Sequence, residues 1–324
     1  MSEQRSGIRP EQRPSRKNAL LLYLLSGVGL YAAPLLVLAF GDALQNVDAN
    51  LLNLAFNLFY YLCFLALPLA LSVKRRPEMF PALRPNPISL PSVLLIVAMA
   101  LLGVYLVNDV TVIWSIPFQK LGFDVTAGGL EVPLDRMGLM LCVVYAAVLP
   151  GICEEFLFRG VLLSAFEAEG TRRAMVITSL LFMLMHGSLI GAPAEFILGM
   201  VIASLVIYTG SVYAGLIYHT VHNSATVLLQ FMQQRLPSAE EIPADYFTAI
   251  GGFPGLLVLL VEIALTAAML RLMLRFFQAR AQLRGVRTAP GARKLLSRGE
   301  WALLIAGVAL TALLYVQDIF LMLA

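Results

Sequence analysis

The stretch Gly151–Leu163, GICEEFLFRGVLL, places two acids and one base inside a long apolar run. Charged side chains at membrane depth are costly unless they pair with each other, line a hydrated cavity or take part in chemistry. The three charges are those of Glu154, Glu155 and Arg159. The surrounding sequence decides among these explanations, because it determines what kind of protein holds the stretch.

The composition indicates a membrane protein with many spans. Of the 324 residues, 59% are hydrophobic and only 13% are charged, which lies outside the usual range of soluble domains. A soluble chain of this length could not bury so much apolar surface. The net charge of +3 is too small to favour nucleic acid as a partner. The three cysteines fall in apolar segments, so we expect packing residues rather than disulfides: Cys63, Cys142 and Cys153.

Several apolar stretches approach or exceed the roughly 20 residues that a helix needs to cross a bilayer. We therefore predict an all-α fold, a polytopic bundle of about nine transmembrane helices. The predicted spans are Asn18–Phe40, Leu51–Val73, Leu90–Ile113, Met137–Ala165, Ala174–Ile190, Ala194–Tyr208, Val212–Met232, Phe253–Met273 and Trp301–Leu323.

The loops between these spans alternate in charge. The amino-terminal tail, 74–76, 172–173 and 275–298 are basic and fall on one side, whereas the loops on the other side carry far fewer Lys and Arg. The positive-inside rule then places the amino terminus in the cytoplasm. The predicted organisation is a disordered basic tail (1–17), amino-terminal helices (18–133), a central core (134–234) and carboxy-terminal helices with a basic cytoplasmic loop (235–324).

Polar side chains within the spans are few, and they include every histidine in the chain. Glu155 and Arg159 are four residues apart, so they share a helix face and can form an ion pair. Glu154 is rotated by about 100° from Glu155 and therefore needs another partner or a function. The other candidate residues within the spans are His186, His219, His222 and Asn223.

Spacing and depth bring these residues toward one pocket. His219 and Asn223 are four apart and share a face, whereas we expect His222 to be a bystander. Counted at about 1.5 Å per residue from the cytoplasmic turns, Glu154, His186 and Asn223 lie at similar depths, with His219 about one turn lower. Three helices can then direct a carboxylate, two imidazoles and an amide into one intramembrane cavity.

Two classes of function fit this set. A carboxylate and an imidazole can activate water, and a second imidazole with an amide can stabilise an oxyanion, so peptide hydrolysis needs no serine or cysteine nucleophile. Glu154 could equally carry protons in a transporter or channel. Residue spacing alone favours hydrolysis and transport almost equally. Zinc bound by Glu154, His186 and His219 is a further option, although the H-E-x-x-H motif is absent.

The ordered motifs resemble those of the CAAX-protease and bacteriocin-processing family of intramembrane endopeptidases, which includes the Ras-converting CAAX endopeptidase. That family carries E-E-x-x-x-R, F-x-x-x-H and H-x-x-x-N on successive membrane helices. The corresponding residues here are Glu154, Glu155 and Arg159, then Phe182 and His186, then His219 and Asn223. The resemblance covers roughly Leu134 to Gln234.

The resemblance implies an intramembrane protease that attacks a peptide bond with a water activated by Glu and His. Glu155 and Arg159 would orient the site, and Phe182 would pack beneath it. The implied catalytic residues are Glu154 as general base, His186 as a second water-activating group, and His219 with Asn223 as the oxyanion site.

Cofactor, partners and location follow as expectations. A metal-free site is favoured, because Asn223 is a poor zinc ligand and a natural donor beside His219. The expected partners are the lipid bilayer and a membrane-associated or lipidated peptide or protein, with no nucleic acid. Arginine far outnumbers lysine, which suits a bacterium with a GC-rich genome and hence its inner membrane. A non-catalytic immunity or scaffold member of the family is a further alternative.

Overall fold

The computed structural model describes most of the chain, and its described residues form helices and loops. No strand occurs among them, so the all-α prediction is confirmed for this part of the protein. The predicted span 51–73 is described only as far as residue 61, and the basic segment 74–76 lies outside the described residues. The described ranges are 13–44, 47–48, 51–52, 54–61, 83–126, 132–235, 245–285 and 295–324.

Eight of the helical elements are uninterrupted α-helices. They are α1 (Arg16–Leu44), α4 (Leu90–Lys120), α8 (Thr171–His186), α9 (Ala192–Thr209), α10 (Val212–Arg235), α11 (Tyr246–Ala249), α12 (Gly252–Leu283) and α13 (Arg298–Leu323).

The predicted span Met137–Ala165 is a single helical segment that two π-helical stretches interrupt. Pro150 lies in its middle and lacks the N–H that an α-helix would use there. Two π-helical turns flank the stretch with Glu154 and Glu155, and such turns are frequent at functional sites. The parts are α5 (Arg136–Val143), η2 (Val144–Val148), α6 (Leu149–Glu155), η3 (Phe156–Leu162) and α7 (Leu163–Phe166).

Helices α8 and α9 form a short hairpin. Helix α8 ends at His186, four residues before the predicted end, because Gly187 adopts a left-handed conformation with φ of 65° that terminates helices. Its 16 residues give a length of about 24 Å, shorter than the roughly 30 Å hydrocarbon core of a bilayer.

Five helical segments in the described part of the chain are long and apolar enough to cross a membrane. The count of nine spans is therefore not confirmed and stays a prediction. The five segments are Leu90–Lys120, Arg136–Glu169, Ala192–Thr209, Gly252–Leu283 and Arg298–Leu323.

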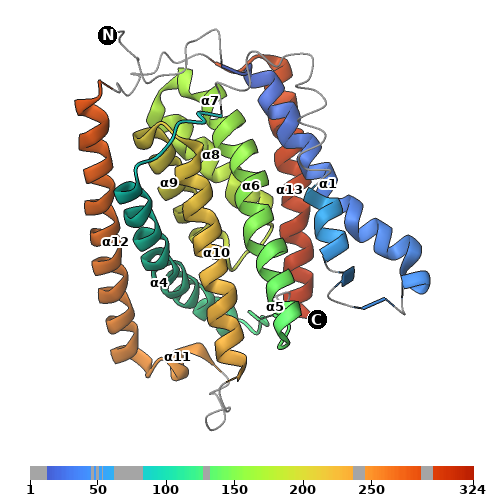
Figure 1. The fold of residues 1–324 in the computed structure, drawn as a ribbon. Coiled ribbons are helices and arrows are strands. Elements are labelled where there is room, and N and C mark those ends of the chain that lie inside the picture. Colours follow the sequence, from blue (N-terminus) through green and yellow to red (C-terminus); the bar gives the residue numbers. More distant parts are fainter. Residues whose placement is uncertain are drawn as a thin grey trace.

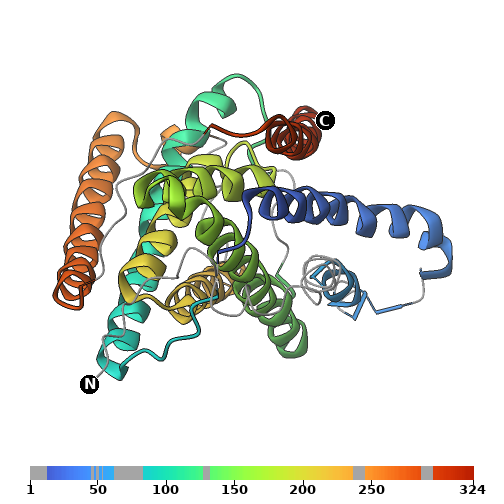
Figure 2. The same ribbon diagram turned by 90° about the horizontal axis from the view of Figure 1, so that it is seen from above.

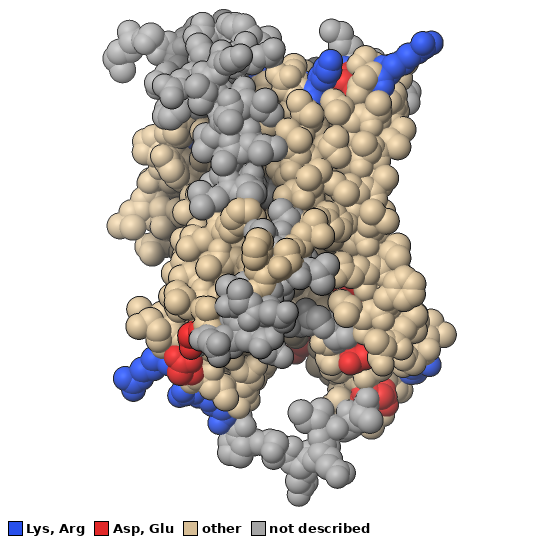
Figure 3. Space-filling model, turned by 90° about the vertical axis from the view of Figure 1, so that its right-hand side faces the viewer, with Lys and Arg blue, Asp and Glu red and all other residues tan. Residues whose placement is uncertain are grey.

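Charged residues gather at two opposite ends of the bundle. At the end that we call the arginine-rich end, Arg16 pairs with Glu169 and Glu300, and Arg84 pairs with Glu167. Lys and Arg are fewer at the opposite end, which carries Lys120, Arg136 and Arg235. Figure 3 shows an uncharged band between the two charged ends on the face that it presents, as expected for a protein surrounded by lipid.

The core of the bundle holds the central motifs. Helix α9 packs against α8, α10 and α4, and α10 also packs against α4 and α6 (Figures 1 and 2). Helices α12 and α13 lie at the periphery (Figure 2) and expose long rows of apolar side chains. Exposed apolar area of this extent is typical of a lipid-facing surface. The candidate site is therefore enclosed by the helices of residues 136–235.

Candidate active site

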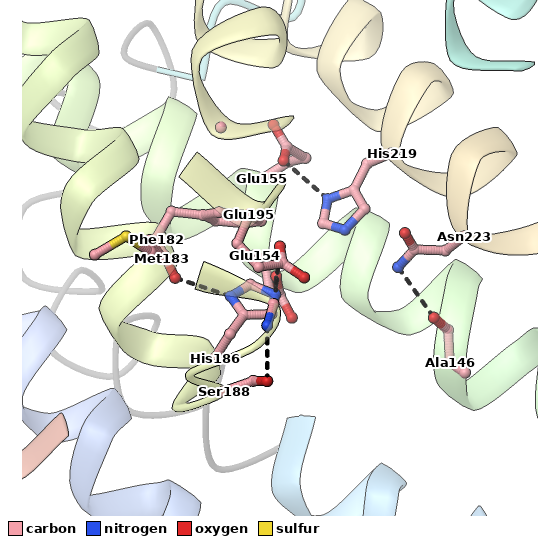
Figure 4. Close-up of polar contacts among 12 residues, drawn as sticks. Ala146, Glu154, Glu155, Phe182, Met183, His186, Ser188, Glu195, His219 and Asn223 are labelled. Atoms are coloured by element: carbon pink, nitrogen blue, oxygen red, sulfur yellow. Dashed lines mark hydrogen bonds and ion pairs between the residues drawn. The ribbon is translucent and has the colours of Figure 1, made fainter. Parts of the chain in front are cut away.

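Adjacent glutamates on α6 supply two separate clusters. Because consecutive residues on a helix point about 100° apart, Glu155 turns toward α10 and Glu154 toward the end of α8. Glu155 contacts His219, whereas Glu154 approaches His186. Figure 4 shows both pairs side by side.

The Glu155 cluster is sealed from solvent. Its Oε1 lies 3.0 Å from Arg159 Nη1 and 3.0 Å from His219 Nδ1, and the side chains of all three residues are 1% exposed. The ion pair that the four-residue spacing predicts is therefore present, and His219 shares its carboxylate. A second guanidinium nitrogen, Nη2, donates to the carbonyl of Gly199 at 3.3 Å. Such pairing is what allows charges to be buried at this depth.

The carboxylate of Glu155 fixes the protonation pattern of His219. A carboxylate paired with Arg159 only accepts hydrogen bonds, so Nδ1 of His219 carries the proton that is donated to it. In a neutral ring Nε2 is then an acceptor, and only the imidazolium donates from both nitrogens. Any role of His219 as a donor through Nε2 therefore requires the charged ring.

The second cluster is more open and contains two carboxylates. His186 Nε2 lies 3.8 Å from Glu154 Oε2 and 3.4 Å from Glu195 Oε2. The side chains of His186 and Glu195 are 27% and 26% exposed, against 10% for Glu154. Both carboxylate oxygens are themselves buried and make no hydrogen bond. This cluster, unlike that of Glu155, is partly exposed.

The other ring nitrogen of His186 is engaged by its own helix. Nδ1 lies 2.8 Å from the carbonyl oxygen of Phe182, and because a carbonyl only accepts, Nδ1 carries a proton. Nε2 therefore faces the oxygens of Glu154 and Glu195. Their lone pairs would repel that of a neutral ring, so the three groups must share a proton or a bridging water.

Phe182 lies between the two clusters and is fully buried. Its ring centroid is 4.4 Å from that of His186 and 5.8 Å from that of His219, and the Arg159 guanidinium lies 4.5 Å from it. The expected packing role of Phe182 is thus visible as contact with both imidazoles, whose relative position it fixes.

Asn223 makes a backbone contact that the sequence analysis did not anticipate. Its Nδ2 donates to the carbonyl of Ala146 at 3.1 Å. Pro150, four residues later, has no N–H to offer this carbonyl, so the amide provides a donor at the break in the span. One N–H of the Asn223 amide is committed to this bond, and its NH₂ group has a second to offer.

The depth estimates succeed for one pair and fail for another. Glu154 and His186 lie level, as expected. His219, expected about one turn lower, instead contacts Glu155, and Asn223 contacts Ala146, eight residues before Glu154 along the chain. A constant rise per residue does not hold for tilted helices or for segments with π-helical turns.

His222 lies away from both clusters. Its ring stacks on Tyr218 at 6.1 Å, and the two side chains lie against Gly103 of α4. This position agrees with the expectation that His222 is a bystander.

Two further residues contact the site, and the motifs did not reveal them. Glu195 is the fourth residue of α9, at the edge of an apolar run where a charge is easily attributed to a loop. Tyr61 donates to Glu154 Oε1 at 3.3 Å from a segment more than 90 residues away in sequence. A signal existed for Glu195, as an acid within the predicted span Ala194–Tyr208, but spacing offers none for Tyr61.

The zinc alternative can be compared with the donor set. The Nδ1 atoms of His186 and His219 bond to oxygen acceptors, a pattern that also occurs in metal-ligating histidines. In the described part of the chain, however, no group of three or more His, Cys, Asp or Glu side chains is arranged to hold a metal ion. Zinc bound by Glu154, His186 and His219 therefore stays an untested alternative.

All three motifs now have positions in one region of the bundle, so the comparison with known families can be made. Residues 136–225 match the family described as type II CAAX prenyl endopeptidase Rce1-like. The resemblance is confirmed. The Rce1-like segment runs from α5 into α10 and covers less than a third of the 324 residues. It contains Glu154, Glu155, His186, Glu195, His219 and Asn223. No curated protein and no solved structure matches the chain.

Proposed function

We propose that the protein is an intramembrane endopeptidase that hydrolyses a peptide bond in a membrane-associated or lipidated protein. The observation that carries this proposal is the gap between Glu154 Oε2 and His186 Nε2. At 3.8 Å it is too long for a direct hydrogen bond but allows one water molecule to bond to both atoms. The Rce1-like match supports the same reaction, because that family consists of endopeptidases.

The proposed reaction begins with this water. Glu154 takes one proton from it, and the oxygen forms a bond to the peptide carbonyl carbon. The tetrahedral intermediate then carries a negative oxygen. The C–N bond breaks as protonated Glu154 returns the proton to the departing nitrogen, so that proton and charge balance over the cycle. His186 bonds to the same water through Nε2 and fixes its direction of attack.

Glu195 enters the proposal as a positioning residue. Its carboxylate lies closer to His186 Nε2 than that of Glu154 does. It thereby supports a proton on His186 during the reaction and leaves Glu154 free to act on the water. Because Glu195 acts through His186, its removal changes the rate of the chemical step more than it changes substrate binding.

The oxyanion site is the part of the proposal that needs charge on His219. As an imidazolium held by Glu155, His219 donates from Nε2, and the second N–H of Asn223 is the other donor. The sealed ion pair between Glu155 and Arg159 then serves two purposes. It neutralises buried charge, and it holds His219 in its donor form.

The orientation that we propose places the arginine-rich end in the cytoplasm, in accordance with the positive-inside rule. His186 then lies about 24 Å from that side, the length of α8. A bacterial inner membrane is the proposed location. A substrate segment would enter the site laterally from the lipid, since the polar cluster lies within the apolar band.

A substrate trap tests the function. Purified full-length Glu154→Gln protein should retain an uncut client that mass spectrometry identifies, and the wild type should then cleave that client at one bond. The matched control is Glu262→Gln, an isosteric change at an exposed position of α12. Cleavage of the client by Glu154→Gln at the wild-type rate would contradict the mechanism.

Transport and scaffolding remain the rival functions. A transporter that uses Glu154 predicts proton or solute flux in proteoliposomes without peptide cleavage. A non-catalytic immunity or scaffold protein predicts neither activity. The paired environments of Glu154 and Glu155 favour hydrolysis over both, because neither rival requires a prepared oxyanion site next to a carboxylate.

A further inference from the structure

Two cavities lie along the seam where α12 meets α4 and α9, and the proposed protease mechanism uses neither. The upper cavity, about 200 Å³, opens at the arginine-rich end and is lined by Ser89, Ser92, Phe277, Arg280 and Arg284 among others. The lower cavity, about 410 Å³, is mainly apolar and is lined by side chains of the same three helices.

The two cavities follow one another along a single face of α12. Leu270 and Leu274 line the lower one, and Phe277 and Arg284 line the upper one. Separations of four, three and seven residues keep these side chains on one face. From Leu270 to Arg284 the helix rises about 21 Å, which is comparable to the length of an extended fatty-acyl chain. The seam is therefore cationic at the bundle end and mainly apolar below, where Arg271 is the one charged side chain among the described residues that line the lower cavity.

The two arginines at the mouth form no ion pair with the described part of the chain. Arg284 donates to the carbonyl oxygens of Tyr208 at 2.8 Å and Arg280 at 3.3 Å, which fixes it beside the cavity. Arg280 lies 5.5 Å from the ring of Phe276. Among the described residues neither guanidinium pairs with a carboxylate, whereas Arg84 at the same end does.

Hydroxyl groups complete the polar mouth. Ser89 and Ser92 lie with their Oγ atoms 2.9 Å apart on the side of the upper cavity opposite to α12. Hydroxyl donors and two guanidinium groups form a set that suits phosphate oxygens. Below them, the exposed Ala267 and Ala268 leave the lower cavity open toward the surrounding lipid.

We propose that this seam binds one anionic phospholipid, with its phosphate at Arg280 and Arg284 and an acyl chain in the lower cavity. Basic pockets between membrane helices are suited to such headgroups because the anionic lipid surface attracts them. A zwitterionic lipid such as phosphatidylcholine also has a phosphate, but its choline cation offsets the attraction to the two guanidinium groups, and free phosphate leaves the apolar cavity unused. The inference goes beyond the protease proposal and does not depend on it.

The test measures lipid bound to the intact protein. Full-length protein is reconstituted in phosphatidylcholine bilayers with or without phosphatidylglycerol, and retained lipid is counted by native mass spectrometry. The wild type should retain phosphatidylglycerol in preference to phosphatidylcholine. The double substitution Arg280→Gln with Arg284→Gln should weaken that retention on the order of tenfold or more, whereas Arg275→Gln, on the same helix but outside both cavities, should leave it near wild type.

A second variant tests the apolar lower cavity of the proposed lipid site. Ala267→Leu narrows the lower cavity and should also reduce the retention of phosphatidylglycerol, while inorganic phosphate should not displace the lipid from the wild type. Equal retention of phosphatidylcholine, equal losses in Arg275→Gln and the double variant, or full displacement by inorganic phosphate would each overturn the proposal. Thermal unfolding of each variant in detergent identifies any loss that comes from misfolding.

Discussion

Glu155 Oε1 lies 3.0 Å from His219 Nδ1, although the two residues belong to different helices and are 64 positions apart in sequence. The same oxygen lies 3.0 Å from Arg159. One carboxylate thus joins a neutralising pair to a site histidine. The two adjacent glutamates therefore have different roles. Glu155 compensates buried charge, and Glu154 belongs to the more open cluster in which the chemistry is proposed.

The buried pair predicts a coupled loss of stability. Glu155→Gln leaves the guanidinium of Arg159, which is 1% exposed, without a counter-ion, and we expect a cost of about 3–5 kcal/mol. The double variant Glu155→Gln with Arg159→Met removes both charges and should be less destabilised than Glu155→Gln alone. Thermal unfolding in detergent measures both. A double variant no more stable than the single one would mean that the pair is not a coupled unit.

The open cluster predicts that Glu154→Gln acts on rate rather than on stability. Loss of a positioned general base should reduce the catalytic rate by about 10²- to 10⁴-fold. Unfolding should change little, because Glu154 Oε2 makes no hydrogen bond. Single-turnover cleavage of the trapped client is the measurement. Undiminished cleavage beside an unchanged Glu262→Gln control would exclude Glu154 as the base.

Glu195→Gln should produce a milder effect of a different kind. Because Glu195 positions His186 from 3.4 Å, we expect kcat to fall about 10- to 100-fold with KM nearly unchanged. The carboxylate of Glu195→Asp, shorter by one methylene, should recover part of the rate. A rise in KM at constant kcat would instead make Glu195 a substrate contact, and no kinetic change would remove it from the site.

The sequence predicted the contacts within the motifs better than it predicted the residues that surround them. The pair Glu155–Arg159 followed from a spacing of four, and the proximity of Glu154 to His186 followed from counting along two helices. The sequence analysis missed Glu195 and Tyr61 because neither residue shares a short-range pattern with the motifs. Their approach depends on how α9 and residues 54–61 pack, which is a tertiary property that local periodicity does not encode.

The fold of the bundle was likewise predicted in part. Apolar length predicted where helices lie, because burying backbone hydrogen bonds in lipid leaves few other structures. It did not predict the early end of α8 at Gly187 or the π-helical turns around Pro150. These features depend on backbone conformation at single residues, and Asn223 takes a position different from the one that an ideal rise implies.

Metal removal should leave the activity unchanged if the favoured metal-free reaction is correct. Incubation with a strong zinc chelator such as phenanthroline, followed by the client cleavage assay, is the measurement. A non-chelating isomer of the same compound controls for direct inhibition. Loss of activity that added zinc restores would reassign Glu154, His186 and His219 as metal ligands.

A substitution at Gly215 tests how tightly the cluster of Glu155, Arg159 and His219 is packed. It lies one helical turn before His219, and a Cβ added there would lie 2.5 Å from Glu155 Oε2 and 3.0 Å from side-chain carbons of Ile202 and Val206. Gly215→Ala should therefore displace the carboxylate from His219 and cost about 1–3 kcal/mol of stability, with a loss of cleavage rate even below the unfolding temperature. Gly299→Ala is the matched control, since nothing lies within 4 Å of an added Cβ there. If Gly215→Ala unfolds and cleaves as the wild type does, the contact between Glu155 and His219 is not needed for the reaction.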